Sequence, residues 1–321
     1  MVLIKPSIIL EVLQEPKQMD NDRYSIIVPT RNRKDLLLEL IRRIDLEDER
    51  LIQLIIVDSS DKNFEAEIMI LSSKIHFVFT DVRSASIQRN IGVKQLSCQS
   101  KYVFFLDDDV KPDIDYFNSL LATIKVGKAI GASGIAIEPK FHDNIDSRFM
   151  CLKKLFLLDS SKGGMLLKSA VNIPIQNRLK RGIDIYSTDW LIGCSVWDVE
   201  IFAKTSFPSN FFGQSLGEDV LFSAKAKKFG NLLVNSKIIL EHDMSDINRP
   251  NKKDHYMMWV RNRYIISKEL RLSKFNIKYH WSNLGMLLNA ILLTLMKNPA
   301  GISSIKGIYL GYKSIRHLNE S

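Results

Sequence analysis

Three consecutive aspartates, Asp107, Asp108 and Asp109, directly follow a short apolar segment, YVFFL (102–106). Adjacent carboxylates repel one another, and taking charge out of water is costly unless a partner or a metal ion neutralises it. In an extended chain Asp107 and Asp109 point the same way, because side chains alternate with a period of two. Such a pair suits Mg²⁺, which also binds substrate phosphates, or Mn²⁺, which also tolerates imidazole. We therefore expect a divalent metal ion carrying a diphosphate here.

A second acidic pair, Glu218 and Asp219, begins the segment GEDVLFSAKAKKFG, which has helical spacing and ends in glycine. Acids in a first helical turn commonly serve only as caps and dipole partners, and this is one interpretation of Asp219. The apolar segment that follows (232–240) predicts a strand that leads to His242. An isolated histidine is usually structural, so the roles of these residues depend on the fold.

The elements that must position these residues alternate between strand-type and helix-type segments over roughly the first 140 residues. The expected strands are 24–28, 51–57, 76–80 and 102–106. The expected helices are 35–44, 66–74 and 86–96, the last capped by Ser84. Nearly continuous apolar strands separated by helices predict an α/β sheet covered on both faces.

Polar groups follow three of the four expected strands. The sequences are PTRNR (29–33), DSSD (58–61) and the aspartate triplet. Ligands of such sheets bind beyond the carboxyl ends of the strands. Solvated loop side chains remain one interpretation of Arg31, Arg33 and Asp58, but three clusters at one rim favour a binding site.

The motifs YSIIVPTRNR, IIVDSSD, QRNIGV, YVFFLDDDVKPD and GEDVLFSAKAKKFG, in this order, resemble those of family 2 glycosyltransferases of the GT-A fold. The resemblance covers roughly residues 23–245, and a basic segment at 259–270 is common downstream in such proteins. It implies an α/β fold with a Rossmann-like mixed sheet and helices on both faces. The nucleotide-binding half would be about 23–112 and the acceptor half about 113–245.

The resemblance implies a nucleotide cradle after the first strand. Pro29, Thr30 and Arg31 would lie along the base and ribose of a nucleotide-diphosphate sugar. Asp58 would accept hydrogen bonds from the base or the ribose.

The family's Arg-Asn-x-Gly helix is matched by Arg89, Asn90 and Gly92. Arg89 could bond the base or a phosphate, or it could pair with Asp58 and be structural; Asn90 is a further candidate for substrate binding. A glycine inside a helix costs about 1 kcal/mol relative to alanine, so Gly92 indicates close packing or ligand approach.

By the same resemblance, Asp107 would contact the ribose and often the metal ion, and Asp109 would bridge the metal ion, Mn²⁺ or Mg²⁺, to the diphosphate. Asp108 is a substrate-binding candidate that we expect to point elsewhere and to matter less. His242 follows the strand at which some members of the family place a histidine ligand of the metal ion.

On the acceptor side, the resemblance makes Asp219 the general base, which takes the proton of the acceptor hydroxyl. Glu218 would orient its neighbours or contact the acceptor. Trp190, in STDWLIGCSVWDVEIF (187–202), would stack on a sugar face or be a core residue.

The charge is unevenly distributed. The chain carries +9 overall, and residues 250–321 hold 12 Lys and Arg against 3 Asp and Glu. We expect a boundary near 245–253, with 1–22 as an N-terminal extension and 246–321 as a basic helical region. The segment at 281–299 is short and interrupted for a membrane span. An amphipathic helix on an anionic membrane, a packing helix and a dimer interface remain open.

Taken together, these features predict a metal-assisted inverting glycosyltransferase. It would transfer a sugar to a hydroxyl of a saccharide or lipid-linked saccharide, in bacterial cell-surface polysaccharide synthesis at the cytoplasmic side of the membrane. Three scattered cysteines fit a reducing compartment, and the N-terminus lacks the pattern of a signal peptide.

Two alternatives remain. A metal-dependent nucleotidyltransferase could use a similar sheet, but such enzymes commonly have a glycine-rich loop after the first strand, and PTRNRKD has no glycine. A nucleic-acid-binding protein could use the basic tail, but no recognition module is evident there, so we expect no nucleic-acid partner.

Overall fold

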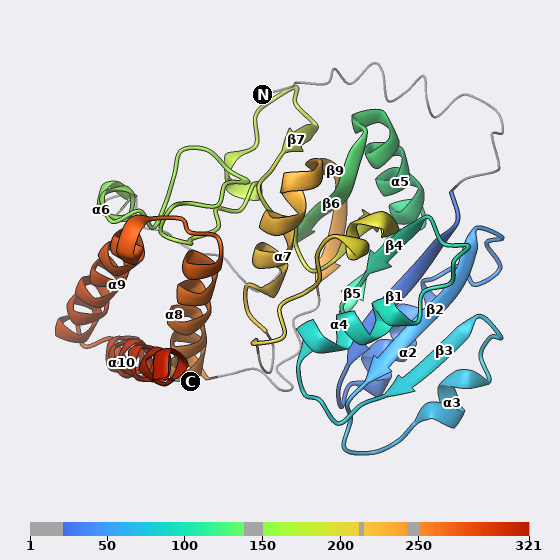
Figure 1. Ribbon diagram of the computed structural model, residues 1–321, viewed down its shortest axis with the longest axis horizontal. Helices are drawn as coiled ribbons and strands as arrows, with labels where there is room; N and C mark the ends of the chain where they lie inside the picture. Colours follow the sequence, from blue (N-terminus) through green and yellow to red (C-terminus); the bar gives the residue numbers. More distant parts are fainter. Residues whose placement is uncertain (1–21, 138–149, 212–214, 243–250, 321) are drawn as a thin grey trace. The chain divides into compact units, whose positions relative to one another are not determined.

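The computed structural model describes residues 22–137, 150–211, 215–242 and 251–320 (Figure 1). These residues form two compact units. The first contains 22–137, 175–211 and 215–242, and the second contains 150–174 and 251–320. The expected N-terminal extension (except for Asp22) and the expected boundary at 245–246 lie outside the described residues. Residues 150–174, expected in the acceptor half, make their contacts with the C-terminal helices.

The first unit is built on a mixed β-sheet. Its strands are β1 (Tyr24–Thr30), β2 (Leu51–Asp58), β3 (Ile75–Phe79), β4 (Tyr102–Phe105), β5 (Val110–Lys111), β6 (Ala129–Ile137), β7 (Ile185–Ser187), β8 (Ser195–Asp198) and β9 (Asn231–His242). They lie in the order β3-β2-β1-β4-β8-β6-β9-β5, and β7 pairs with β9. β1 is parallel to β2 and β4, whereas β8 runs antiparallel to β4. The predicted mixed α/β sheet is confirmed.

Helices cover both faces of this sheet. They are α2 (Lys34–Arg42), α3 (Glu65–Met69), α4 (Ala85–Lys94), α5 (Tyr116–Gly127) and α7 (Glu218–Ala226), with 3₁₀ turns at Gln176–Arg178, Val199–Ala203 and Lys227–Phe229. Side chains alternate along β1, so Ile26 and Val28 pack with α2 and α5. Ile27 packs in the other layer, with α4 and α7. The sheet is therefore buried on both faces, as its continuous apolar strands predicted.

Two helix predictions have different outcomes. Ser84 caps α4 as expected, because its side chain accepts a hydrogen bond from the Ile87 N–H. The helix expected at 66–74 is shorter, since α3 ends at Met69 and Ile70 is exposed. Ser72 and Ser73 follow, and serine side chains compete for backbone hydrogen bonds and favour turns.

The second unit is helical, which confirms the expected helical C-terminal region. Its helices are α6 (Met150–Leu155), α8 (Lys252–Glu269), α9 (Ile277–Leu295) and α10 (Pro299–Glu320), with a 3₁₀ turn at Lys274–Asn276. Their core contains Val260, Tyr279, Met286, Ile308 and Ile315. Across the part of the chain that the structure describes, no helix is both long and apolar enough to cross a membrane.

A buried arginine, Arg263 of α8, holds this unit together. Its guanidinium donates to the Ser169 carbonyl (2.7 Å), the Asn283 Oδ1 (3.0 Å) and the Ser282 hydroxyl, and lies 4.9 Å from the centre of the Trp259 ring. These partners are neutral, and burial lowers the pKa of Arg263 to about 10. The arginine links 150–174 to α8 and α9, which gives a physical reason why that segment belongs to the second unit.

The packing of α4 against β1 can be tested at Gly92. A Cβ at this position would lie 2.5 Å from Ile27 Cγ2, so the helix sits directly on the strand. Overpacking costs about 1–3 kcal/mol, and the gain in helix propensity offsets at most about 1 kcal/mol. We expect Gly92→Ala to lower the free energy of unfolding, measured by urea denaturation. Combined with Ile27→Ala, the effects should be less than additive, and a neutral Gly92→Ala would contradict the close packing.

Candidate active site

The carboxyl ends of β1, β2 and β4 meet at one rim of the sheet. Thr30 pairs with Asp58 in the parallel register of β1 and β2. Phe105, the last residue of β4, pairs with Ser195, the first of the antiparallel β8. The aspartate triplet after β4 and the segment before β8 are therefore brought to the same rim as Thr30 and Asp58.

Asp58 is a fully buried carboxylate with one unsatisfied oxygen. Its Oδ1 accepts hydrogen bonds from the Ser60 backbone N–H (3.0 Å) and the Ser60 hydroxyl (2.5 Å). Its buried Oδ2 has no hydrogen-bond partner among the described residues. Burial raises the pKa of Asp58. A buried acceptor of this kind normally has a partner, so Oδ2 can accept a hydrogen bond from a bound ligand.

Gln88 of α4 fixes the ends of β1 and β2, a role that sequence reasoning missed. Its amide nitrogen donates to the backbone carbonyls of Thr30 (2.9 Å) and Val57 (2.7 Å). The residue lies in the quoted QRNIGV motif, but its partners are backbone atoms, which no sequence pattern reveals.

Asp108, which we expected to point elsewhere, is buried and bonded to both Thr30 and Arg33. Thr30 Oγ1 donates to its Oδ2 (2.7 Å) and Arg33 Nη1 to its Oδ1 (2.9 Å). Burial raises the pKa of Asp108 to about 6, although Arg33 acts in the opposite direction. The extended alternation assumed for the triplet does not apply, because Asp108 and Asp109 lie in a turn.

Asp109 lies between Arg33 and His242. Arg33 Nη1 is 3.1 Å from its Oδ2, and His242 Nε2 is 3.0 Å from its Oδ1. The histidine reaches this place because β9 pairs with β5, with Val110 opposite His242. A carboxylate beside an imidazole is a donor set that accepts Mn²⁺. Within the described ranges, no group of three or more His, Cys, Asp or Glu side chains is arranged to hold a metal ion.

Arg89 joins the triplet to the acidic pair of α7. Its side chain is 3% exposed, its Nη2 donates to Asp107 Oδ1 (2.7 Å), and its Nη1 donates to Glu218 Oε1. The pairing of Arg89 with Asp58, left open from the sequence, is not the one observed. Asp107 thus pairs with Arg89, whereas Asp109 pairs with Arg33 and His242.

The start of α7 places Glu218 and Asp219 at a bend in the chain. Gly217 has φ 86°, a left-handed conformation that favours glycine. Asp219 is half-buried, and its Oδ1 accepts a hydrogen bond from the Val220 N–H (2.8 Å). Burial raises the pKa of Asp219 to about 6, although Arg89 acts in the opposite direction. Burial raises the pKa of Glu218 to about 8; the charge of Asp219 adds to this shift and Arg89 opposes it.

The remaining candidates have different surroundings. The Asn90 amide donates to and accepts from the backbone of Phe207 (2.8 and 3.0 Å), so it holds a loop. The Nη2 of Arg31 lies 3.9 Å from the Oδ2 of Asp61, at the exposed rim of the sheet. Trp190 is 9% exposed, and its buried indole N–H has no partner in the described part of the chain. Pro29 is a buried residue of β1.

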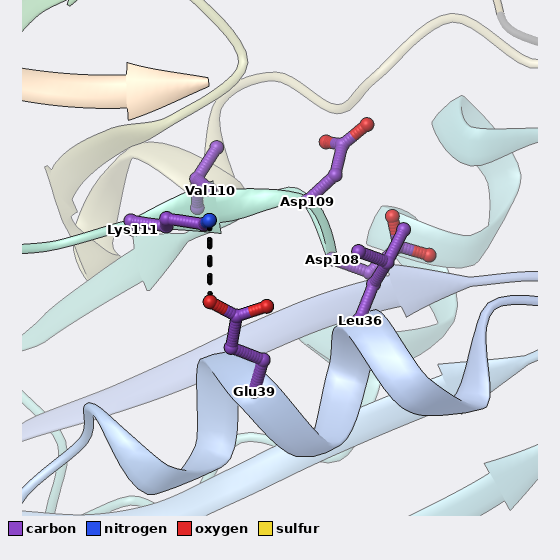
Figure 2. Close-up of a pocket in the computed structure, with 6 residues that line it drawn as sticks. All are labelled: Leu36, Glu39, Asp108, Asp109, Val110 and Lys111. Atoms are coloured by element: carbon purple, nitrogen blue, oxygen red, sulfur yellow. Dashed lines mark ion pairs between the residues drawn. The ribbon is translucent and has the colours of Figure 1, made fainter. Parts of the chain in front are cut away.

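A small hollow lies beside the triplet, against α2 (Figure 2). Its lining residues are Leu36, Glu39, Asp108, Asp109, Val110 and Lys111. Lys111 Nζ is 3.2 Å from Glu39 Oε1, and Asp109 points away from α2. The hollow has a volume of about 0 Å³ for a water-sized sphere, whereas typical small-molecule sites measure roughly 300–1,000 Å³. We therefore do not assign the nucleotide to it.

Solved structures share this fold. The crystal structure of S. aureus TarS 1-349 matches with a TM-score of 0.53 and 14% identity over 92% of this chain and 91% of that one. The S. aureus TarS crystal structure matches with a TM-score of 0.50 and 17% identity over 86% of this chain and 43% of that one. The structure of GalNAc-T7 with UDP, GalNAc and Mn²⁺ matches with a TM-score of 0.54 and 14% identity, over 82% and 55%.

This chain thus spans less than two thirds of the longer TarS chain and of GalNAc-T7, and at these identities the likeness shows a shared GT-A fold. No curated protein matches the chain. The family model described as "Glycosyl transferase family 2" matches residues 25–178. This segment holds the first four of the motifs that carried the resemblance. Residues 25–178 therefore match glycosyltransferase family 2, the family that the motifs predicted.

Proposed function

We propose that the protein is an inverting glycosyltransferase that transfers a sugar from a nucleotide-diphosphate sugar to a hydroxyl of a saccharide or lipid-linked saccharide. The observation that carries the proposal is the double pairing of Arg89 with Asp107 and Glu218. The residues that we propose for binding the donor and the acceptor thus contact the same buried guanidinium, that of Arg89. Cell-surface polysaccharide synthesis on the cytoplasmic side of the membrane remains the proposed context.

The donor nucleotide would lie along the rim formed by Thr30, Arg31 and Asp58. The unsatisfied Oδ2 of Asp58 supports this placement, because a base N–H or a ribose hydroxyl would satisfy it. Thr30 already donates to Asp108, so these two residues would act together. Asn90 would contribute by holding the Phe207 loop.

Asp109 and His242, whose Oδ1 and Nε2 lie 3.0 Å apart, would hold a divalent cation, and Asp107 would have to leave Arg89 to join them. Mg²⁺ sites commonly combine one or two carboxylates with substrate phosphates, so a complete set of protein ligands is not required. The Mn²⁺ and UDP in the GalNAc-T7 structure support the same choice of cofactor. A bound Mn²⁺ or Mg²⁺ would neutralise charge on the diphosphate leaving group.

In the proposed reaction, Asp219 accepts the proton of the acceptor hydroxyl. The acceptor oxygen forms a bond to the anomeric carbon from the side opposite the diphosphate. The bond from that carbon to the diphosphate oxygen breaks, and the nucleoside diphosphate leaves with the electron pair. We assign the base to Asp219 because Glu218 is held by Arg89 and fully buried, whereas Asp219 is partly exposed.

The nucleotide site can be tested with UDP-, GDP- and dTDP-sugars in the presence of Mn²⁺. A ligand at 100 times its Kd stabilises the folded state by about 2.7 kcal/mol, so the matching donor should raise the Tm by several degrees. Asp58→Asn keeps the shape but loses the acceptor, and we expect at least tenfold weaker donor binding. Because burial raises the pKa of Asp58, the neutral variant should be as stable as wild type or more stable.

The matched control for this test is Asp61→Asn, an exposed carboxylate on the same loop, which should bind the donor within a few-fold of wild type. Unchanged donor binding in Asp58→Asn would contradict the assignment of Asp58.

The metal assignment is tested at Asp109. We expect Asp109→Ala to lose the Mn²⁺-dependent part of donor binding, measured by calorimetry with and without Mn²⁺. The apo protein should lose some stability, because Arg33 and His242 lose a buried partner, although repulsion within the triplet falls. Asp113→Asn, an exposed acid of the same segment, is the control and should retain the Mn²⁺ effect. An undiminished Mn²⁺ effect in Asp109→Ala would place the ion elsewhere.

The base is tested by Asp219→Asn. We expect kcat to fall about 10²–10⁴-fold, with donor affinity within a few-fold of wild type. A base must be deprotonated, and the pKa of Asp219 is raised to about 6. Wild-type kcat should therefore fall as the pH drops below about 6, and this acidic limb should vanish in the variant. The rival role as a helix cap predicts a loss of about 1 kcal/mol of stability with near-normal turnover.

A further inference from the structure

One face of α9 is apolar yet exposed. Its apolar residues recur at intervals of three or four: Ile277, Trp281, Leu284, Leu288, Ile291 and Leu295. The exposed fraction of these residues ranges from 42% at Trp281 and Ile291 to 75% at Leu295. Such spacing places them on a single stripe, which we call the α9 stripe. The opposite face of the helix, with Tyr279, Ser282, Met286 and Ala290, is buried in the second unit. A helix that is apolar on both faces needs a second partner.

The stripe continues onto α6. The Trp281 indole N–H donates to the Leu155 carbonyl (2.8 Å), and the Phe156 and Trp281 rings lie 5.0 Å apart. Leu152 and Leu155 of α6 are themselves exposed. A contiguous apolar surface of this kind is rarely left open to water and marks an interaction site.

Positive charge surrounds this apolar surface. Lys274 and Lys278 lie at the start of α9, Lys297 follows its end, and Lys153 and Lys154 lie on α6. The sequence from 270 to 319 contains no Asp or Glu. The second unit, counted over 150–174 and 251–320, has 16 Lys and Arg against 4 Asp and Glu. The partner of this surface must therefore be apolar and carry negative charge at its edge.

We propose that the α9 stripe and the exposed leucines of α6 dock onto the surface of an anionic lipid bilayer. A helix with an apolar face flanked by lysines lies in the membrane interface, with its apolar side chains among the lipid chains and its lysines at the headgroups. Trp281 suits this position, because tryptophan is favoured at membrane interfaces. The helix lies on the membrane, in keeping with the lack of a membrane-crossing helix in the described residues.

A second copy of this chain fits the surface less well. A symmetric pair would bring the same lysines of two copies together, and like charges at an interface oppose association. The proposed membrane-binding surface lies in the second unit and the proposed sugar-transfer site in the first. An experiment can therefore contradict one proposal without contradicting the other.

The test uses the full-length chain with vesicles of phosphatidylcholine alone and with 30% phosphatidylglycerol. We expect binding to the anionic vesicles, weakened at least tenfold when NaCl is raised from about 50 to 500 mM, because salt screens exposed charges. Trp281 fluorescence should shift to the blue on binding, and brominated lipids should quench it. Trp281→Phe should lose most of this signal, since Trp190 and Trp197 are buried and Trp259 packs against Arg263 and the core of the second unit.

The decisive variant is Leu284→Glu combined with Leu288→Glu, which places two charges in the stripe without touching the core. It should bind at least tenfold more weakly. The matched control is Ile114→Glu, an isolated residue of the first unit that is 92% exposed, and it should bind as wild type does. Lys274→Ser with Lys278→Ser should weaken binding only to the anionic vesicles.

Any of three outcomes would overturn the proposal. The double variant binds vesicles as tightly as wild type, or wild type binds both kinds of vesicle equally. In the third outcome wild type binds neither kind and sediments as a dimer, which the double variant does not form. Circular dichroism and donor-sugar binding of the double variant establish that it is folded. Lost donor transfer in a variant with normal vesicle binding would count against the proposed function alone.

Discussion

The buried guanidinium of Arg89 is the interaction on which the site depends. Its burial at 3% exposure is costly unless acceptors surround it, and Asp107 and Glu218 supply them from the end of β4 and the start of α7. Removing either acid would leave part of the cation's charge uncompensated, whereas removing the arginine would leave the buried Glu218 and the partly exposed Asp107 without their shared partner. The proposed donor and acceptor sides are therefore linked through this one side chain.

The sheet topology makes this coupling possible. Parallel strands β1, β2 and β4 all end at one rim, and the antiparallel β8 starts there, so four separate loops converge. β9 then pairs with β5 and carries His242 to Asp109. Gln88 and Ser84 of α4 bind the loops from one side. The proposed catalytic groups are thus on regular elements or directly beyond them, which keeps a dense cluster of charges in one arrangement.

The sequence predicted the rim better than the bonds within it. The apolar strands and the polar residues that follow them showed where Thr30, Asp58, the triplet and α7 lie. The spacing of apolar residues and the residue types of turns are local features of the sequence, so they can be read without knowing the fold. The partners of Arg33 and Gln88 depend on tertiary packing, and no local signal identifies them. The assumption of an extended triplet failed because the chain turns at Asp108. The association of 150–174 with α8 and α9 rests on contacts such as Arg263 with Ser169, which the sequence does not reveal.

The balance of charge in the site explains why the proposed donor calls for a cation. Two arginines, Arg33 and Arg89, form direct ion pairs with acids of the site. The site contains six acids: Asp58, Asp107, Asp108, Asp109, Glu218 and Asp219. An anionic diphosphate would be repelled by this excess of negative charge. Burial is the main cause of the raised pKa values of Asp108, Asp219 and Glu218, and a neighbouring acid raises each of them further. A metal ion beside Asp109 and His242 would correct the balance in the place proposed for the diphosphate, and Asp219 would remain available for its proposed role as the base.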